Sequence, residues 1–435
     1  MIGAQLHEHA PNLTQAEWDG IKSLQVQQKN RQIIVKPNDK TGGCSILDFD
    51  SYVETMRAKL KDTFVGKDGE VMQKYSRVDS KDLQTSWTRV RDIVKEGQQC
   101  GYIYDANAAM MVPDSPKPGR LYGLVKDHKP VDPNSGIPPL REVISGSGSN
   151  TEFISAYVDY HCKAEVKKLP SFIEDTPHFL RDISEFNERG RLPEQAILVS
   201  MDVTALYPSI PWKEGLEAME EALTRREDRT VPDSFILRLM LLVLGSNIFE
   251  FDSELWLQKD GTAIGTRAAP TFANIFMDKW EERSQSGWTG SQIEFWRRFI
   301  DDIFFIWLGT EADLKEFVKF VNSLLPSIKV TVEYNIQSRS VNYLDVTVFI
   351  DNDGYLRTDL YKKENLKISY LMPTSSHPDH ISKNIPYSLA YRIKRICWND
   401  ELFERRISEL SEALVLQGYK YKSIQDSIDR VRKIS

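Results

Sequence analysis

The strongest constraint on the fold is a pair of adjacent acids, Asp301 and Asp302, in the middle of the apolar stretch RRFIDDIFFIW, residues 297–307. The flanking residues are β-forming and apolar on both sides, so they predict two strands joined by a turn that carries both carboxylates. An Asp-Asp pair alone is weak evidence, because about one is expected by chance in a chain of this size, and a solvated turn is the default interpretation. The apolar flanks favour a turn that a buried hairpin holds in place.

Two other stretches indicate that the hairpin belongs to a larger site. Asp202 ends the apolar strand ILVSMD, which can lie beside the hairpin in one sheet, and QKDGTAIGTRAAP brings small residues and backbone close to it. Carboxylates gathered on one sheet repel each other, and a divalent cation with oxygen ligands relieves the repulsion. Two such ions activate an attacking hydroxyl and stabilise a leaving oxygen, so the pattern predicts phosphoryl transfer.

Tyr207 follows Asp202 in DVTALYPSIP, where the strand bends into a turn at Pro208. A flat ring at this place can lie under a bound sugar and exclude a 2′-hydroxyl, which favours deoxynucleotides. The alternative is a core aromatic side chain. Taken alone, the tyrosine does not decide between the two.

The order of predicted elements favours an α+β fold. We expect a helix at 12–30 with a capping box from Thr14 to Glu17, strand-turn-strand at 32–49, mostly helix and loop at 50–112, and an irregular functional segment at 112–148. These are followed by a helix, a strand ending at Asp202 and helices to about residue 244. Next we expect a strand pair, a helix, the carboxylate hairpin, a helix at 312–325, further strands and C-terminal helices. This order fits a split βαβ sheet with helices on one face.

Composition bounds the function less tightly. The net charge of −7 argues mildly against a nucleic-acid partner, although KPNDK, KDHKP, YKK and RIKRIC are local basic clusters. The four cysteines are scattered, which predicts reduced thiols in an intracellular protein and neither a disulfide framework nor a zinc site. No apolar run approaches the roughly 18 residues of a membrane span, and the N-terminus lacks the features of a signal peptide. We therefore expect a soluble, unsecreted protein with no membrane partner.

The motifs together resemble those of reverse transcriptases. SMDVTALYPSIP, QKDGTAIGTRAAPTFANIFM and RRFIDDIFFIW are similar in order and spacing to the family's motifs A, B and C. The flanking blocks KPNDKTGG, LYGLVKDHKP, PLREVISGSGSNTE, VNYLDVTVFI, TDLYKKENLKISYL and SSHPDHISKNIPYSLAYRIKRIC narrow the resemblance to Penelope-like retroelements, relatives of telomerase-type enzymes. The resemblance covers residues 33–400 and implies a right-hand polymerase with fingers, a ferredoxin-like palm of antiparallel sheet plus helices, and a helical thumb.

The resemblance also implies roles for individual residues. Asp202, Asp301 and Asp302 would hold two Mg²⁺ ions, with Mn²⁺ as an alternative. Tyr207 would be the steric gate, and Arg141 would bind the triphosphate through its planar guanidinium. The remaining implied residues are Val203, Lys126, Gln258 and Gly265 at the nucleotide, Lys129, Gly261, Arg392 and Arg395 at the nucleic acid, and Lys329 as the catalytic lysine that protonates pyrophosphate.

Some of these assignments have open alternatives. Lys329 is also explained as a surface lysine on a strand, and Arg392 and Arg395 as part of a solvated helix face. The sequence departs from the family at Phe299, where a tyrosine is usual, at Val125, where a proline is usual, and in PNDKT, where PADKG is usual. None of these departures changes a metal ligand, and the last two lie in the expected fingers.

The implied activity is RNA-directed DNA polymerisation: extension of a DNA 3′-hydroxyl on an RNA template. The expected partners are the RNA template, a DNA primer or target DNA, and deoxynucleoside triphosphates; the sequence does not decide the oligomeric state. A catalytically silent polymerase-fold RNA-binding factor is the alternative, and a two-metal nuclease would explain the acids but not Tyr207 or the glycine loop. The family further implies action in the nucleus.

The expected domains are an N-terminal helical extension at 1–30, fingers at 31–190, a palm at 191–365 with helices 213–245 contributing to the fingers, and a thumb at 366–435. Many family members carry a GIY-YIG endonuclease after the polymerase, and we expect none within this chain.

Overall fold

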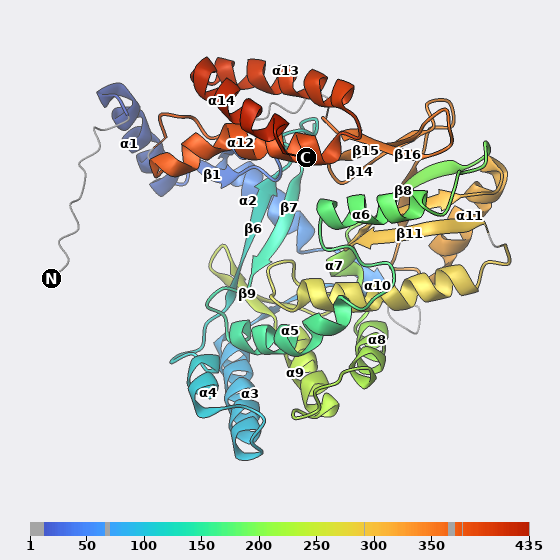
Figure 1. The fold of residues 1–435 in the computed structure, drawn as a ribbon. Coiled ribbons are helices and arrows are strands. Elements are labelled where there is room, and N and C mark those ends of the chain that lie inside the picture. The colour runs from blue at the N-terminus through green and yellow to red at the C-terminus, as the bar shows by residue number, and fades with distance from the viewer. Residues whose placement is uncertain (1–12, 66–69, 291, 364–369, 376, 435) are drawn as a thin grey trace.

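The computed structural model describes residues 13–65, 70–290, 292–363, 370–375 and 377–434 (Figure 1). The residues outside these ranges include the first twelve of the predicted N-terminal extension and residues 366–369 at the beginning of the predicted thumb.

The palm is a four-stranded antiparallel sheet in the order β11-β12-β8-β13. Its strands are β8 (Ile197–Val203), β11 (Ile293–Phe299), β12 (Asp302–Trp307) and β13 (Val330–Glu333). Numbered along the chain, the order is 2-3-1-4, which is the ferredoxin-like arrangement of a split βαβ unit. The predicted α+β palm is confirmed.

Both faces of the palm sheet are buried. Helices α10 (Ala269–Ser286) and α11 (Glu311–Leu324) pack on one face, over Val199 and Phe305. The other face is covered by α6 (Thr176–Asn187) and by a three-stranded sheet of β14 (Ser340–Tyr343), β15 (Val346–Ile350) and β16 (Leu356–Leu360). Figure 1 shows α6 and α10 on opposite sides of the palm strands. The expectation of helices on one face was therefore wrong, because β8 and β12 are apolar almost throughout and need cover on both sides.

A second sheet has five strands in the order β5-β10-β9-β6-β7. They are β5 (Tyr75–Val78), β6 (Gly119–Val125), β7 (Leu140–Ser145), β9 (Ile248–Phe251) and β10 (Glu254–Gln258), packed with α2 (Phe49–Lys59). The segment expected to be irregular therefore contains two strands. The strands β9 and β10, which the sequence assigned to the palm, complete this sheet instead, because they pair with β5 and β6.

The remaining N-terminal elements surround these sheets. They are α1 (Gln15–Lys29), β1 (Ile33–Pro37), β2 (Cys44–Asp48), β3 (Thr63–Val65), β4 (Val71–Gln73), α3 (Ser80–Gln99), α4 (Asp105–Met111), α5 (Glu152–Val166), α7 (Leu206–Ser209), α8 (Trp212–Thr224) and α9 (Asp233–Gly245). The predicted capping box is present at the start of α1, where Thr14 and Glu17 exchange hydrogen bonds.

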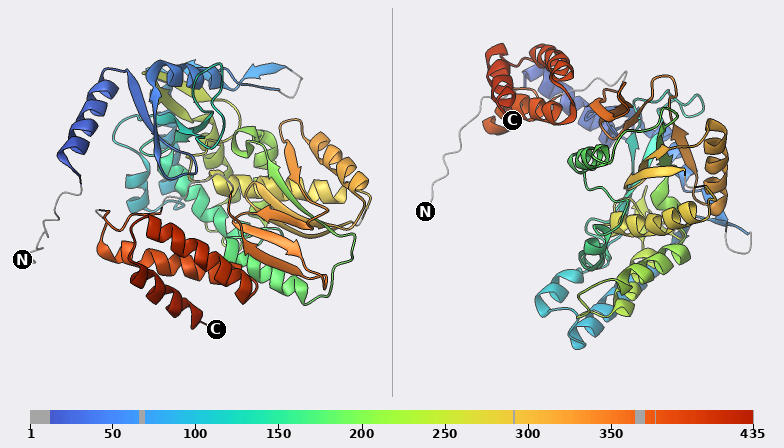
Figure 2. Two further views of the ribbon diagram at one scale, coloured as in Figure 1. Left: turned by 90° about the horizontal axis from the view of Figure 1, so that it is seen from above. Right: turned by 45° about the vertical axis from the view of Figure 1, so that its right-hand side comes forward.

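The C-terminal region is a bundle of α12 (Asp379–Ile396), α13 (Asp400–Leu416) and α14 (Tyr421–Arg432), as the sequence predicts. The three helices share their own apolar core, which includes Ile393, Phe403 and Ile424. Figure 2 shows this bundle beside the three-stranded sheet. No described helix combines the length and the apolar character that a membrane crossing requires.

Candidate active site

The three predicted carboxylates lie at one end of the palm sheet. Asp202 and Asp302 are directly opposite each other in the register of β8 and β12. Side chains in such a pair have their Cβ atoms only about 5 Å apart. Asp301 lies in the turn before β12, and its carbonyl accepts the Val203 N–H at 3.2 Å. The Val203 amide, which we expected near the nucleotide, thus holds the turn of the carboxylate hairpin against β8.

Burial and the repulsion of neighbouring carboxylates raise the pKa values of Asp301 and Asp302. Burial, followed by the charges of Asp301 and Asp202, raises the pKa of Asp302 to about 7. Burial, together with the charge of Asp202, also raises the pKa of Asp301, although Arg141 and Lys40 act in the opposite direction. The protein therefore holds negative charge here without supplying enough positive charge to balance it.

The donor set suits a hard divalent cation, because all three groups offer carboxylate oxygens. Within the described residues, however, no group of three or more His, Cys, Asp or Glu side chains is already arranged to hold a metal ion. The carboxylates thus match such an ion in chemical type but do not form a complete cage. An ion bound here would need further oxygen ligands from water or from a phosphate group.

The glycine loop packs against the turn that follows Asp202. A Cβ atom added to Gly261 would lie 2.5 Å from the carbonyl oxygen of Pro208, and its φ of +69° also favours glycine. A Cβ atom on Gly265 would lie 2.3 Å from the carbonyl oxygen of Ile144, at the end of β7. The two glycines therefore allow this loop to join the palm turn to the second sheet.

Gln258 lies at the start of the same loop and is 2% exposed. Its side-chain amide donates to the carbonyl of Asp260 at 2.8 Å and accepts from Asn247 at 2.8 Å. In this structure the side chain holds the shape of the loop. Its predicted contact with template and nucleotide stays a prediction.

Tyr207 lies within the electrostatic reach of Asp301 and Arg141. Burial, with a contribution from Asp301, raises the pKa of Tyr207 to about 12, so its hydroxyl is neutral at physiological pH. Its carbonyl accepts the Thr262 N–H at 2.8 Å, which ties the residue to the glycine loop. The backbone of Tyr207 is thus tied to the glycine loop, and its predicted role as a gate stays a prediction.

Arg141 extends from β7 toward the carboxylates and forms an ion pair with Asp39, at 3.1 Å. Its charge acts on both Asp301 and Tyr207. Lys40, next to Asp39 in KPNDK, also acts on Asp301 and Asp302, and the sequence analysis did not assign it to the site. The signal was available, because KPNDK is one of the basic clusters.

Lys126 and Lys129 lie directly after β6, in a turn closed by a 2.8 Å bond from the Lys129 N–H to the Lys126 carbonyl. Burial and the charges of Lys363, Lys40 and Lys129 lower the pKa of His128 in the same turn. Lysines from three parts of the chain therefore lie close together near the C-terminal end of β6.

Three other predicted residues have protein partners. Lys329 donates from Nζ to the Asn322 carbonyl at 2.7 Å, so its ammonium lies against the end of α11. Arg392 forms an ion pair with Asp345, and the Arg395 guanidinium lies over the Tyr391 ring, 5.7 Å from its centroid. The Lys329 backbone lies beside the end of the Asp202 strand, because its carbonyl accepts the Thr204 N–H at 2.8 Å. The predicted roles of these three residues stay predictions.

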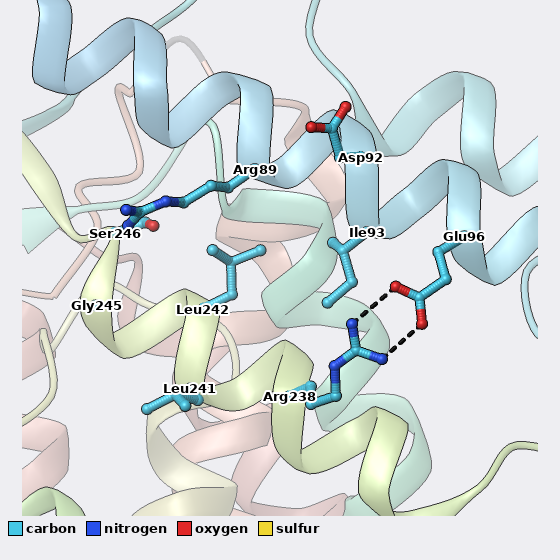
Figure 3. Close-up of a pocket in the computed structure, with 9 residues that line it drawn as sticks. All are labelled: Arg89, Asp92, Ile93, Glu96, Arg238, Leu241, Leu242, Gly245 and Ser246. Carbon is cyan, nitrogen blue, oxygen red and sulfur yellow. Dashed lines mark hydrogen bonds and ion pairs between the residues drawn. The ribbon is translucent and has the colours of Figure 1, made fainter.

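A cavity of about 530 Å³ lies elsewhere, between α3 and α9 (Figure 3). A bidentate ion pair from Arg238 to Glu96, at 2.6 and 2.7 Å, closes one side of it, and Ile93 and Leu242 line its floor. None of the three palm carboxylates lines this cavity.

The solved structures that the chain resembles include polymerases. The chain superposes on apo telomerase from Candida tropicalis truncated from its C-terminal domain with a TM-score of 0.51, 11% identity, and coverage of 75% of this chain and 63% of that chain. For Candida albicans telomerase in complex with a fragment of telomeric RNA, the TM-score is 0.59 and the identity 9%, with coverage of 95% of this chain and 73% of that chain. For the RNA-dependent RNA polymerase of a human picobirnavirus, the TM-score is 0.50 and the identity 10%, with coverage of 96% of this chain and 83% of that chain. At such identities the likeness shows the right-hand fold alone.

No curated protein matches the sequence. Two family models do match it: an animal helix-turn-helix domain at residues 369–429, and a reverse transcriptase, RNA-dependent DNA polymerase, at residues 156–347. The second range contains Asp202, Asp301 and Asp302. Residues 156–347, less than half of the chain, therefore match the family model of reverse transcriptases, which are RNA-dependent DNA polymerases.

Proposed function

We propose that this protein is the RNA-directed DNA polymerase of a Penelope-like retroelement. It extends a DNA 3′-hydroxyl on an RNA template, by in-line attack on the α-phosphate of a deoxynucleoside triphosphate with release of pyrophosphate. The observation that carries the proposal is the placement of Asp202 opposite Asp302 within the matched domain, with Asp301 in the adjoining turn. The flanking sequence blocks support the Penelope-like assignment.

Asp202, Asp301 and Asp302 would hold two Mg²⁺ ions, which supply an activated hydroxyl and a stabilised leaving oxygen when bound. The chain itself fixes Asp202 and Asp302 opposite each other at the end of the palm sheet. Tyr207 is neutral and would lie beneath the sugar, where its ring excludes a 2′-hydroxyl.

Arg141 would change partners when the nucleotide binds. Its guanidinium is paired with Asp39 in this structure, and its side chain is 41% exposed, so a triphosphate can reach it. A guanidinium binds phosphate oxygens in a bidentate manner, and the phosphate's greater charge favours the exchange. Lys40 adds positive charge on the same side of the carboxylates.

The thumb would contact nucleic acid through one face of α12 and α14. Tyr387 and Tyr391 stack with a ring separation of 6.2 Å, and Arg430 and Arg395 lie over their rings at 4.5 and 5.7 Å. Aromatic rings and guanidinium groups together suit the bases and the phosphate backbone. The match of residues 369–429 to a helix-turn-helix domain supports this assignment. Arg392 is a weaker candidate than Arg395, because Asp345 neutralises it.

Primer extension tests the proposal. Purified protein would be given an RNA template annealed to a DNA primer, with Mg²⁺ and either deoxy- or ribonucleotides. We expect extension that depends on deoxynucleotides and is lost in Asp302→Asn. A Tyr207→Ala variant should incorporate ribonucleotides more readily than wild type.

The alternative is a catalytically silent RNA-binding factor with a polymerase fold. The intact carboxylates argue against it. Acids that repel one another destabilise the fold, and a protein retains such acids where its activity needs them. Folded protein that binds RNA tightly without Mg²⁺, and extends no primer on any template, would favour this alternative.

A further inference from the structure

A charged network lies beneath the turn that carries Asp301 and Asp302. Arg298, on β11, is 0% exposed, and Glu281, on α10, is 4% exposed. Their side chains pair at 2.9 Å, from Nε to Oε1. Burying two charges is unfavourable unless their remaining hydrogen-bonding groups are also satisfied, so such a pair requires an explanation.

The Arg298 guanidinium connects α10 to the carboxylate turn. Besides the bond to Glu281, Nη1 donates to the side-chain oxygen of Asn274 at 2.6 Å, and Nη2 donates to the Asn274 carbonyl at 3.1 Å. Nη1 also donates to the carbonyl of Ile300 at 3.2 Å. One planar group thus holds a helix and a turn in a fixed relation.

Glu281 is held by further donors. Its carboxylate accepts from the Trp296 indole N–H at 2.6 Å and from the Ser171 hydroxyl at 2.6 Å. The backbone of Arg298 is fixed as well, because its N–H donates to the Ser171 carbonyl at 2.6 Å. The orientation of the guanidinium is therefore determined by contacts on several sides.

Three consecutive carbonyls of the turn each accept a hydrogen bond from a different element. The Ile300 carbonyl accepts from Arg298, that of Asp301 from the Val203 N–H on β8, and that of Asp302 from the Tyr343 hydroxyl on β14, at 3.1 Å. Burial raises the pKa of Tyr343 well above its ordinary value, so this hydroxyl remains a donor. The turn is thus held from three directions.

The turn has an unfavourable backbone conformation. Ile300 has a φ of +56°, a left-handed value that a β-branched residue rarely adopts. Such a conformation persists only where the surroundings impose it. The bond from Arg298 to the carbonyl of this same residue is one of the contacts that do so.

We propose that Arg298 and Glu281 are positioning residues that set the orientation of Asp301 and Asp302 relative to α10. Because α10 follows the glycine loop, the pair also fixes the carboxylates relative to the surface on which the nucleotide would lie. The inference rests on the proposed function for its catalytic meaning. An arginine is needed because a lysine ammonium cannot contact Glu281, Asn274 and Ile300 in one plane.

The test compares Arg298→Lys with Arg226→Lys, a matched control in the connection between α8 and α9. Arg226 is also buried, at 5% exposure, and pairs with Asp233 at 2.8 Å, with no contact to the carboxylate turn. Both variants should lose thermal stability. For each we would measure kcat and KM for deoxynucleotides, the Kd for an RNA/DNA duplex, and Mn²⁺ binding by paramagnetic resonance without nucleic acid.

We expect Arg298→Lys to lower kcat by about 10- to 100-fold and to weaken Mn²⁺ binding several-fold, as is typical when the support of a metal ligand is removed. Its Kd for the duplex should stay within about twofold of wild type, since no thumb residue is touched. Arg226→Lys should keep wild-type kcat and Mn²⁺ binding in its folded fraction. Tyr343→Phe, which removes one hydroxyl and keeps the ring, should give a smaller loss in the same direction.

Wild-type kcat and Mn²⁺ binding in folded Arg298→Lys would overturn the inference, as would equal losses in Arg226→Lys. The two readouts separate this result from a failure of the proposed function. If the wild type extends no primer but Arg298→Lys still weakens Mn²⁺ binding, the polymerase proposal fails and the positioning role stands. If the wild type extends primers and the variant behaves identically, only the positioning role fails.

Discussion

Asp302 in the palm and Asp359 on β16 are carboxylates in opposite electrostatic environments. Burial and two neighbouring carboxylates raise the pKa of Asp302 to about 7. Burial also acts to raise the pKa of Asp359, but hydrogen bonds and the charges of Arg406 and Arg405 outweigh it and hold that pKa below its ordinary value. Both arginines reach Asp359 at 2.7 Å.

The difference separates an acid that stabilises the fold from an acid reserved for chemistry. Asp359 joins β16 to α13 and has cations of its own, so its charge contributes to stability. Asp302 faces other acids and destabilises the protein in its ionised form. Perturbed groups of this second kind are typical of functional sites, where stability is lost for activity.

The largest expected effect is on catalysis. Asp302→Asn should reduce primer extension by roughly 1,000-fold or more, because it removes a carboxylate that would hold the ions that stabilise charge in the transition state. Asp359→Asn should retain most of the activity of its folded fraction, because Asp359 belongs to the contact between β16 and the thumb. Single-turnover extension, normalised to folded protein, measures both. Equal losses in the two variants would contradict the assignment of Asp302 to catalysis and of Asp359 to stability.

The second-largest expected effect is on the free energy of unfolding and follows from the substitution of Asp359. Asp359→Asn should lower the free energy of unfolding by about 3 kcal/mol, because it leaves Arg406 partly buried without its partner carboxylate. Urea denaturation of the two variants and of wild type measures the change. Arg405→Lys is a suitable control: Arg405 is 55% exposed, so its substitution should have a much smaller effect. An unchanged midpoint in Asp359→Asn would show that this pair does not stabilise the fold.

The sequence alone predicted the palm strands, the carboxylate hairpin and the glycine loop, because each depends on local patterns of apolar residues and glycines. It could not predict the partners of Asp359, which lie 46 and 47 residues later on another helix. It also gave no reason to single out Arg298. Beside Arg297, this residue looks like half of an exposed basic pair, and only the packing of α10 under the turn buries it. The second face of the palm was missed because α6 has no motif that assigns it to a sheet.

The third effect has the opposite sign to the second. The pKa of Asp302 is raised on folding, so its contribution to stability is present at low pH and is lost as the pH rises through about 7. Metal-free Asp302→Asn should therefore be more stable than wild type at pH 8, by about 2 kcal/mol, given about 1.4 kcal/mol per pKa unit and partial solvent screening.

The same comparison at pH 6 should show a smaller advantage of the variant, because most folded wild-type molecules then carry a protonated Asp302. The advantage should disappear only as the pH approaches about 4, where Asp302 is protonated in the unfolded chain as well. Asp359 behaves differently: its lowered pKa keeps its contribution constant over this range, and the contribution is lost only as the pH falls below the ordinary range of a carboxyl. A stability difference between wild type and Asp302→Asn that does not change from pH 6 to 8 would contradict the assignment of the raised pKa.

The smallest effect concerns Mg²⁺ and joins the two sides of the comparison. An ion that binds only the folded protein stabilises it by about 1.4 kcal/mol at ten times its Kd. Because binding requires ionised carboxylates, Mg²⁺ should raise the Tm of wild type more at pH 8 than at pH 6, where a proton competes at Asp302. Asp359→Asn should keep this Mg²⁺ response although it starts from a lower Tm, whereas Asp302→Asn should lose it although it starts from a higher one. Thermal melts of wild type, Asp359→Asn and Asp302→Asn at pH 6 and pH 8 thus test whether Asp302 both destabilises the palm and binds Mg²⁺. If Asp302→Asn keeps the Mg²⁺ response, Asp302 is not the group that binds the ion.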